Sequence, residues 1–166
     1  MRKIITSAAI AAAAVALLGG AGAAAAGTHS ATTGTENFQL MSTSATAPTN
    51  SVIASGVFTA PGVDHENQQA NTAKFVFSNG TVSLKHSKGT GQQSFNPKTC
   101  LLTINQHGTY ALPGGTGSYA GITGSGKYQL SILAIGARNS AGKCSQAKPP
   151  VAFHQVINAS GPVTLP

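Results

Sequence analysis

Acidic side chains are the scarcest feature of this 166-residue chain, which has only three of them and no tryptophan. So few carboxylates exclude carboxylate-rich metal cages and most acid–base dyads. Charged residues of either sign make up only 8% of the sequence, whereas glycine occurs 20 times. Low charge combined with high glycine argues against helical bundles and coiled coils.

Long apolar runs are also absent, except at the N-terminus. Met1-Arg2-Lys3 is basic, residues 4–18 are apolar and rich in alanine, and Ala24-Ala25-Ala26 matches a signal-peptide cleavage pattern. The apolar run is too short for a membrane anchor. We therefore expect a cleaved signal peptide over 1–26, a flexible N-terminus over 27–35, one domain over 36–166, and a secreted, extracellular protein with no membrane span after cleavage.

Cysteine is limited to Cys100 and Cys144. Two cysteines in an exported protein usually pair, so we predict a disulfide between them. The alternative, a nucleophilic thiol, would make one of them a reactive group.

The formal charge is positive. Without Arg2 and Lys3, eight Lys and Arg residues face three acids, which gives +5. This excess favours anionic neighbours such as a cell-wall polymer. The basic residues are scattered and not interleaved with aromatic side chains, so we expect no nucleic-acid partner.

The apolar residues of the domain recur with a period of two, which is typical of β-strands. The clearest local signal is Asn79-Gly80, which suits a two-residue type I′ hairpin turn. Counting outward from this turn places Phe77 opposite Val82 and Phe75 opposite Leu84, with all four on one face. We read Ala60-Pro61-Gly62 as a chain break.

Further along the chain, residues 100–112 predict one long strand that bends at Gly108. Alternation resumes around Tyr128 and again over 151–157, after a polar loop over 138–148 that carries Cys144. Seven or eight short antiparallel strands predict an all-β barrel or sandwich.

One segment carries a family resemblance. Residues 110–130 read YALPGGTGSYAGITGSGKYQL, which resembles the part of allene oxide cyclase and dirigent proteins where a strand ends in G-G-T/S-G, an aromatic follows, and A/E-G-x-x-G leads into the next strand. The similarity covers roughly residues 74–135 and is greatest to bacterial secreted members. It implies an eight-stranded antiparallel β-barrel of calycin type with a central cavity, and oligomers are frequent in the family. The matching residues are Gly114, Gly115, Thr116, Gly117, Tyr119, Gly121 and Gly124.

The catalytic pattern of that family transfers poorly. The cyclases place an acidic residue in the first strand, facing the cavity, and dirigent proteins also use acidic cavity residues. Here the comparable stretch, residues 38–43, has no carboxylate. We expect Glu36 to be solvated at the strand entrance. The resemblance therefore supports the fold more than the activity.

Asp64-His65-Glu66 holds the other two acids. On an extended segment Asp64 and Glu66 would share a face and could chelate a cation or act as an acid–base pair. Because the break at residues 60–62 precedes them, we favour a solvated turn. The five histidines show no H-x-H or H-x-x-x-H ligand spacing. We predict no metal, no cofactor and no catalytic residue.

Polar residues that share a face with apolar ones are the candidate site. If those faces line a barrel cavity, the mixture suits a mostly apolar small ligand with one or two hydrogen-bonding groups. The alternative is that these residues lie at strand ends or in a homo-oligomer interface. The candidates for the cavity are His86, Gln106, Tyr110, Tyr128, Gln155, Phe75 and Phe77.

Three functions follow from these features. The leading hypothesis is a secreted, non-catalytic protein that binds a small apolar ligand or an extracellular partner. The second is a cyclase or dirigent-like protein that confines a reactive intermediate, which can rely on shape and desolvation. The third is a structural protein held on the cell wall by its charge.

Overall fold

The computed structural model describes residues 30–166, and these form an all-β structure without helices. The strands of this part of the chain are β1 (Thr32–Ser42), β2 (Asn50–Ser55), β3 (Thr59–Asn67), β4 (Thr72–Phe77), β5 (Gly80–His86), β6 (Thr90–Asn96), β7 (Leu101–Gly117), β8 (Thr123–Ile135) and β9 (Ala152–Leu165). No helix of the described residues could cross a membrane.

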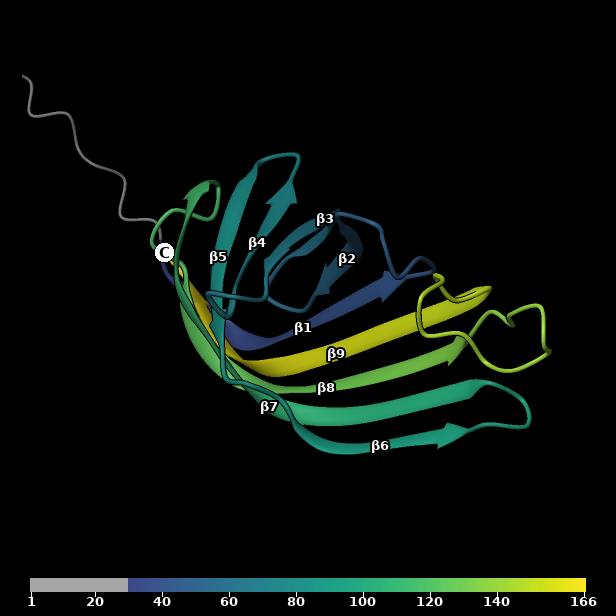
Figure 1. The fold of residues 1–166 in the computed structure, drawn as a ribbon. Coiled ribbons are helices and arrows are strands. Elements are labelled where there is room, and N and C mark those ends of the chain that lie inside the picture. The colour runs from purple at the N-terminus through teal and green to yellow at the C-terminus, as the bar shows by residue number, and fades with distance from the viewer. Residues whose placement is uncertain (1–29) are drawn as a thin grey trace, which may run out of the picture.

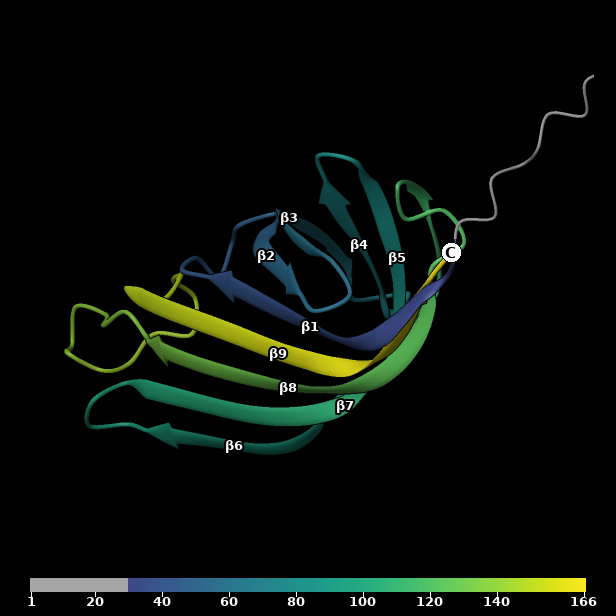
Figure 2. The same cartoon turned by 180° about the vertical axis from the view of Figure 1, so that it is seen from behind.

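The strands form an antiparallel barrel that closes through the longest of them, β7 (Figure 1). The order is β5-β4-β3-β2-β1-β9-β8-β7-β6, and β5 also pairs with β7. The second half of β7 pairs with β5 and completes eight strands, while its first half pairs with the extra strand β6. The predicted eight-stranded antiparallel β-barrel is confirmed. Both views show β6, β7, β8, β9 and β1 side by side, with β2 to β5 curling over them (Figure 2).

The first strand starts earlier than expected. Thr32 to Thr35 belong to β1 and pair with residues 162–165 of β9, whereas the sequence predicts a flexible N-terminus over 27–35. Their small and hydroxylated side chains carry no apolar alternation, so the period-two signal begins only at Glu36. The predicted signal peptide over 1–26 lies outside the described residues.

The hairpin between β4 and β5 forms where predicted, but its register differs by two residues. Phe77 pairs with Gly80 and Phe75 pairs with Val82, so the loop is Ser78-Asn79. Gly80 is required for another reason, because a Cβ atom there would overlap the carbonyl oxygen of Thr116 in β7. Since the shift in register is even, the predicted apolar face is unchanged.

The predicted break at Ala60-Pro61-Gly62 is wrong, because these residues lie inside β3 and pair with β2. Gly62 is opposite Phe77, and a Cβ atom on it would lie 2.6 Å from the Phe77 ring. The glycine therefore makes room for an aromatic ring and does not end the strand.

Aromatic rings fill one end of the barrel. Tyr119 follows β7 and stacks on Phe58 and Phe77, with ring centroids 4.7 and 5.3 Å apart. Ile122 beside it is fully buried. Phe38 continues this core towards the middle of the barrel through Phe75, at a centroid distance of 5.2 Å. This end of the interior is therefore occupied by buried aromatic side chains.

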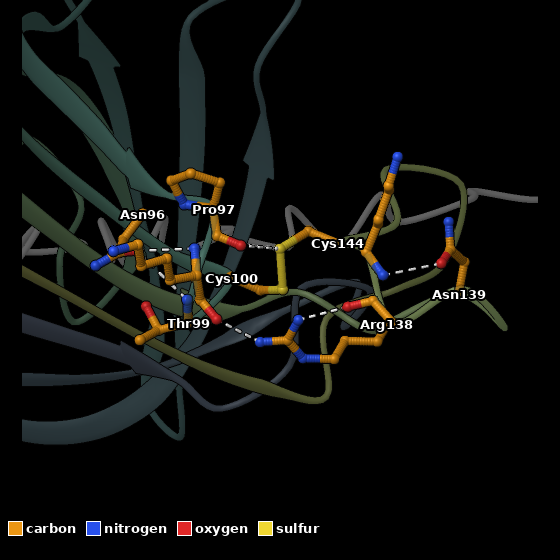
Figure 3. Close-up of a disulfide and its surroundings, with 10 residues drawn as sticks. Asn96, Pro97, Thr99, Cys100, Arg138, Asn139 and Cys144 are labelled. Atoms are coloured by element: carbon orange, nitrogen blue, oxygen red, sulfur yellow. Dashed lines mark hydrogen bonds between the residues drawn. A yellow bond between two sulfur atoms is a disulfide. The ribbon is translucent and has the colours of Figure 1, made fainter.

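The predicted disulfide joins Cys100, just before β7, to Cys144 in the loop between β8 and β9 (Figure 3). Arg138 lies beside it and donates to the carbonyl oxygens of Gly142 at 2.6 Å and Lys98 at 2.5 Å. The described part of the chain has no free cysteine, so the alternative of a reactive thiol is excluded.

Candidate functional site

An open cavity of about 810 Å³ occupies one end of the barrel. The opposite end holds the packed rings of Phe58, Phe77 and Tyr119, which we call the aromatic plug. The walls of the cavity are the inward faces of the strands, and the loops over 43–49, 68–71 and 87–89 surround its mouth. A volume of this size accommodates a small organic molecule. The apolar part of the wall is made by Leu40, Phe75, Leu84, Ile104, Leu130, Ile132, Phe153, Ile157 and Ala159.

Six of the seven candidates from the sequence line this cavity, and Phe77 does not. Phe77 points to the same interior but lies deeper, packed between Phe58 and Tyr119 in the plug. The period-two pattern identified the face correctly, but it cannot tell where along a strand the interior is filled. The six that line the cavity are His86, Gln106, Tyr110, Tyr128, Gln155 and Phe75.

The first polar pair of the cavity is His86 and Glu66, whose Nε2 and Oε1 atoms are 2.9 Å apart. The other ring nitrogen, Nδ1, lies 3.0 Å from the carbonyl oxygen of Ser87. A carbonyl oxygen accepts, so Nδ1 carries a proton in this contact, and a carboxylate beside Nε2 favours protonation of that nitrogen as well. Burial alone would lower the pKa of His86, but the bonds to Ser87 and Glu66 outweigh it and raise the pKa above its usual value.

Tyr128 supports this pair from β8. Its hydroxyl donates to the carbonyl oxygen of Ser87 at 3.0 Å, and its ring meets that of His86 edge-on at a centroid distance of 6.0 Å. The Ser87 carbonyl therefore contacts both side chains, which fixes the imidazole of His86 at the cavity mouth beside apolar walls.

A second set of polar side chains forms a hydrogen-bonded chain from the cavity to a buried carboxyl in its wall. Gln155 donates to Asn50 Oδ1 at 3.5 Å, and Asn50 donates to Asp64 Oδ2 at 2.8 Å. Asp64 is fully buried, and its Oδ1 has no hydrogen-bond partner among the described residues. Burial raises the pKa of Asp64 from 3.8 to about 6. Asp64 is therefore a carboxyl that can hold or release a proton near neutral pH.

The predictions for all three acids need correction. Asp64 and Glu66 lie on β3 and face the interior, so the expected solvated turn is wrong. Glu36 lies on β1 and is fully buried, not solvated at the strand entrance. The first strand therefore does carry an inward-facing carboxylate. The missed signal is parity, because Glu36 shares its face with Phe38 and Leu40.

Glu36 occupies the plugged end and does not line the cavity. Its Oε2 accepts a hydrogen bond from the backbone N–H of Phe58 at 3.0 Å, and burial raises its pKa. The hydroxyl of Tyr110 is buried without a partner among residues 30–166. Burial, followed by the negative charge of Glu36, raises the pKa of Tyr110 to about 12. Tyr110 thus remains a neutral hydroxyl between plug and cavity.

The arrangement suits binding and proton exchange more than metal chemistry. Within the described range no three His, Cys, Asp or Glu side chains come together as metal ligands. The sequence places Asp64 and Glu66 in a solvated turn, because residues 60–62 have the composition of a break, and it gives no signal for Asn50. Asp64 pairs with Phe75, so residue parity changes between β3 and β4, and counting back from Phe75 in steps of two does not reach either acid.

Comparison of the chain with protein-family models, with curated proteins and with solved structures finds no match. The geometry of the cavity therefore carries the functional conclusion.

Proposed function

We propose that this protein binds a small, mostly apolar molecule in the open end of its barrel. The observation that carries the proposal is the cavity of about 810 Å³, in which apolar side chains share the wall with polar ones, several of them fixed by hydrogen bonds. Cavities of this composition hold their ligand by apolar burial and orient it by hydrogen bonds.

The polar groups narrow the class of ligand. The Glu66–His86 pair offers a carboxylate and an imidazole at one part of the mouth, and Gln155 with Asn50 offers amide groups beside the loop over 43–49. A hydrophobic molecule that carries two polar groups, such as a carbonyl, a hydroxyl or a carboxylate, could meet both pairs. Mostly hydrocarbon ligands without such groups would leave the polar pairs desolvated, which costs binding energy.

The test fills the cavity with a bulky side chain in one variant. A matched variant carries the same side chain on the outer face of the same strand. Gln106→Trp points an indole into the cavity from β7, whereas Asn105→Trp points one outward. We expect native mass spectrometry of the protein from its source cells to show a bound mass, which Asn105→Trp keeps and Gln106→Trp loses. Because the natural chain has no tryptophan, the indole fluorescence of each variant also reports its surroundings.

The proposal is contradicted if the natural protein carries no bound molecule and takes up none from an extract of its source. It is equally contradicted if both tryptophan variants retain the ligand, because the molecule would then lie elsewhere.

Control of a reactive intermediate is a second candidate, and Asp64 favours it. A buried carboxyl with a pKa of about 6, linked through Asn50 to the cavity, can exchange a proton near neutral pH. The resemblance to cyclases and dirigent proteins implies the same kind of role. Substitutions at His86, Gln106 and Tyr110 should then alter product stereochemistry. Unchanged stereochemistry in all three would favour simple binding.

Export is part of the proposal. The disulfide between Cys100 and Cys144 is consistent with an oxidising compartment, and the predicted signal peptide over 1–26 would direct the chain there. Detection of mature protein in the culture medium, with a new N-terminus at Gly27, would establish secretion.

A further inference from the structure

A second surface of interest is the outer face of the four long strands β1, β9, β8 and β7, on the opposite side of the sheet from the cavity. Directly paired residues form a row across them, from Gln39 on β1 through Asn158 on β9 and Gln129 on β8 to His107 on β7. All four are exposed, and Figure 1 shows these strands side by side.

The row runs along a hollow, not a flat surface. Two adjoining depressions of about 490 and 300 Å³ share Gln129 and Asn158. The larger one reaches Asn37, Ser160 and Lys127, and the smaller one reaches Asn105 and Ser131. The lining is therefore rich in amides and hydroxyls, with one lysine and no acid.

Part of the row is held in place by its own hydrogen bonds. Gln39 donates to Asn158 Oδ1 at 3.3 Å, and Ser160 donates to Asn37 Oδ1 at 2.8 Å. These bonds leave the Asn158 amide N–H groups free to donate outward, while Gln129 makes no side-chain hydrogen bond within residues 30–166. Pre-positioned amides lose little conformational entropy when they bind a partner.

The distribution of charged side chains indicates which sign of charge a binding partner would carry. Glu36 and Asp64 are fully buried and Glu66 lines the cavity, so no acidic side chain of the described chain lies on the outside of the barrel. The eight Lys and Arg residues of this part are all exposed. The charged side chains on the exterior of residues 30–166 are therefore all cationic, and Lys127 brings one such charge to the amide row.

We propose that this outer groove, defined by Gln39, Asn158, Gln129, His107 and Lys127, binds an acidic polysaccharide. Neighbouring strands lie about 4.8 Å apart, so the row presents one polar side chain per strand at a spacing comparable with a sugar ring. Amide groups hydrogen-bond to sugar hydroxyls, and Lys127 pairs with an anionic substituent. No Phe, Tyr or Trp side chain stands in the row, whereas proteins that bind single-stranded nucleic acid stack bases on such rings.

The test uses the purified full chain and immobilised polygalacturonate as the acidic probe, with amylose as a neutral polymer and duplex DNA for comparison. Lys127→Gln should weaken binding to polygalacturonate about ten-fold, because it removes a charge-assisted hydrogen bond. Gln129→Ala should weaken it about five-fold. Lys74→Gln, which removes the same charge from β4 on another side of the barrel, should change it less than about two-fold.

Circular dichroism checks that each variant folds. Lys127 and Gln129 are both exposed, so their substitutions test the groove independently of each other. The proposal is overturned if the chain does not bind polygalacturonate at low salt. Equal losses for Lys127→Gln and Lys74→Gln would also overturn it, because binding would then follow net charge alone. DNA binding as tight as polygalacturonate binding would do the same. None of these outcomes depends on whether the cavity holds a ligand.

Discussion

At the scale of single residues, the unusual feature is that a chain with three acids keeps all of them inside. Glu36 and Asp64 are fully buried, and each leaves one carboxylate oxygen without a partner among the described residues. A buried, half-satisfied carboxylate destabilises the fold when it is charged. Such groups are retained where they serve a function, and Asp64 is connected to the cavity through Asn50.

Asp64 should make the stability of the protein depend on pH. Its pKa is raised from 3.8 to about 6, so folding favours the protonated form. This contribution to stability is complete below pH 3.8 and is lost as the pH rises through about 6. Asp64→Asn should therefore match the natural protein in acid and exceed it at pH 8 by up to about 3 kcal/mol. Urea unfolding across this pH range measures the difference.

Asn50→Leu is the matched variant for that experiment. It removes the hydrogen bond that favours the charged carboxylate, so the midpoint of the pH dependence should move upward. A difference between Asp64→Asn and the natural protein that stays constant from acid to alkaline pH would show that Asp64 does not titrate in this window.

At the scale of elements, barrel closure depends on the close approach of β5 and β7. Gly80 has φ of 147°, and a Cβ atom there would overlap the backbone oxygen of Thr116. The sequence pattern singles out Gly80 but for the wrong reason, since it predicts a turn where the structure has a strand contact. Contacts between strands that are distant in sequence leave no local pattern, so residue spacing alone cannot show them.

Gly80→Ala should destabilise the barrel more than the same substitution at a glycine where the new Cβ atom would meet no neighbouring atom. Gly114 is the matched control, because it has φ of 150° but no atom within 4 Å of the position that a Cβ atom would take. We expect a loss of at least about 2 kcal/mol for Gly80→Ala and about 1 kcal/mol for Gly114→Ala. Equal losses in urea unfolding would show that backbone conformation, not strand approach, sets the cost.

At the scale of the whole molecule, the alternation of apolar residues predicted an antiparallel barrel or sandwich, and only the family resemblance selected the barrel. The alternation also placed Phe75, His86, Gln106, Tyr110, Tyr128 and Gln155 on the cavity wall. It could not show that Phe77 is covered by Tyr119, because that contact joins β4 to the segment after β7. Nor could it place Asp64, whose neighbours at residues 60–62 have the composition of a turn.

The disulfide should contribute substantially to global stability. It closes a sequence separation of 44 residues, and restricting an unfolded loop of that length stabilises the fold by about 4 kcal/mol. The double variant Cys100→Ala/Cys144→Ala should lose about this free energy of unfolding, and the reduced natural protein should behave like it. A loss below about 1 kcal/mol would mean that other contacts, such as those of Arg138, already order the loop.

The same bond has a consequence for the integrity of the chain. The segment between Cys100 and Cys144 contains β7, β8 and the exposed Lys143, and the disulfide turns it into a covalent ring. A peptidase that cuts after Lys143 opens the ring but releases nothing, because the two pieces remain tied through sulfur. Such a cut yields two fragments only after reduction, so a peptidase can nick this loop without separating the two parts of the molecule.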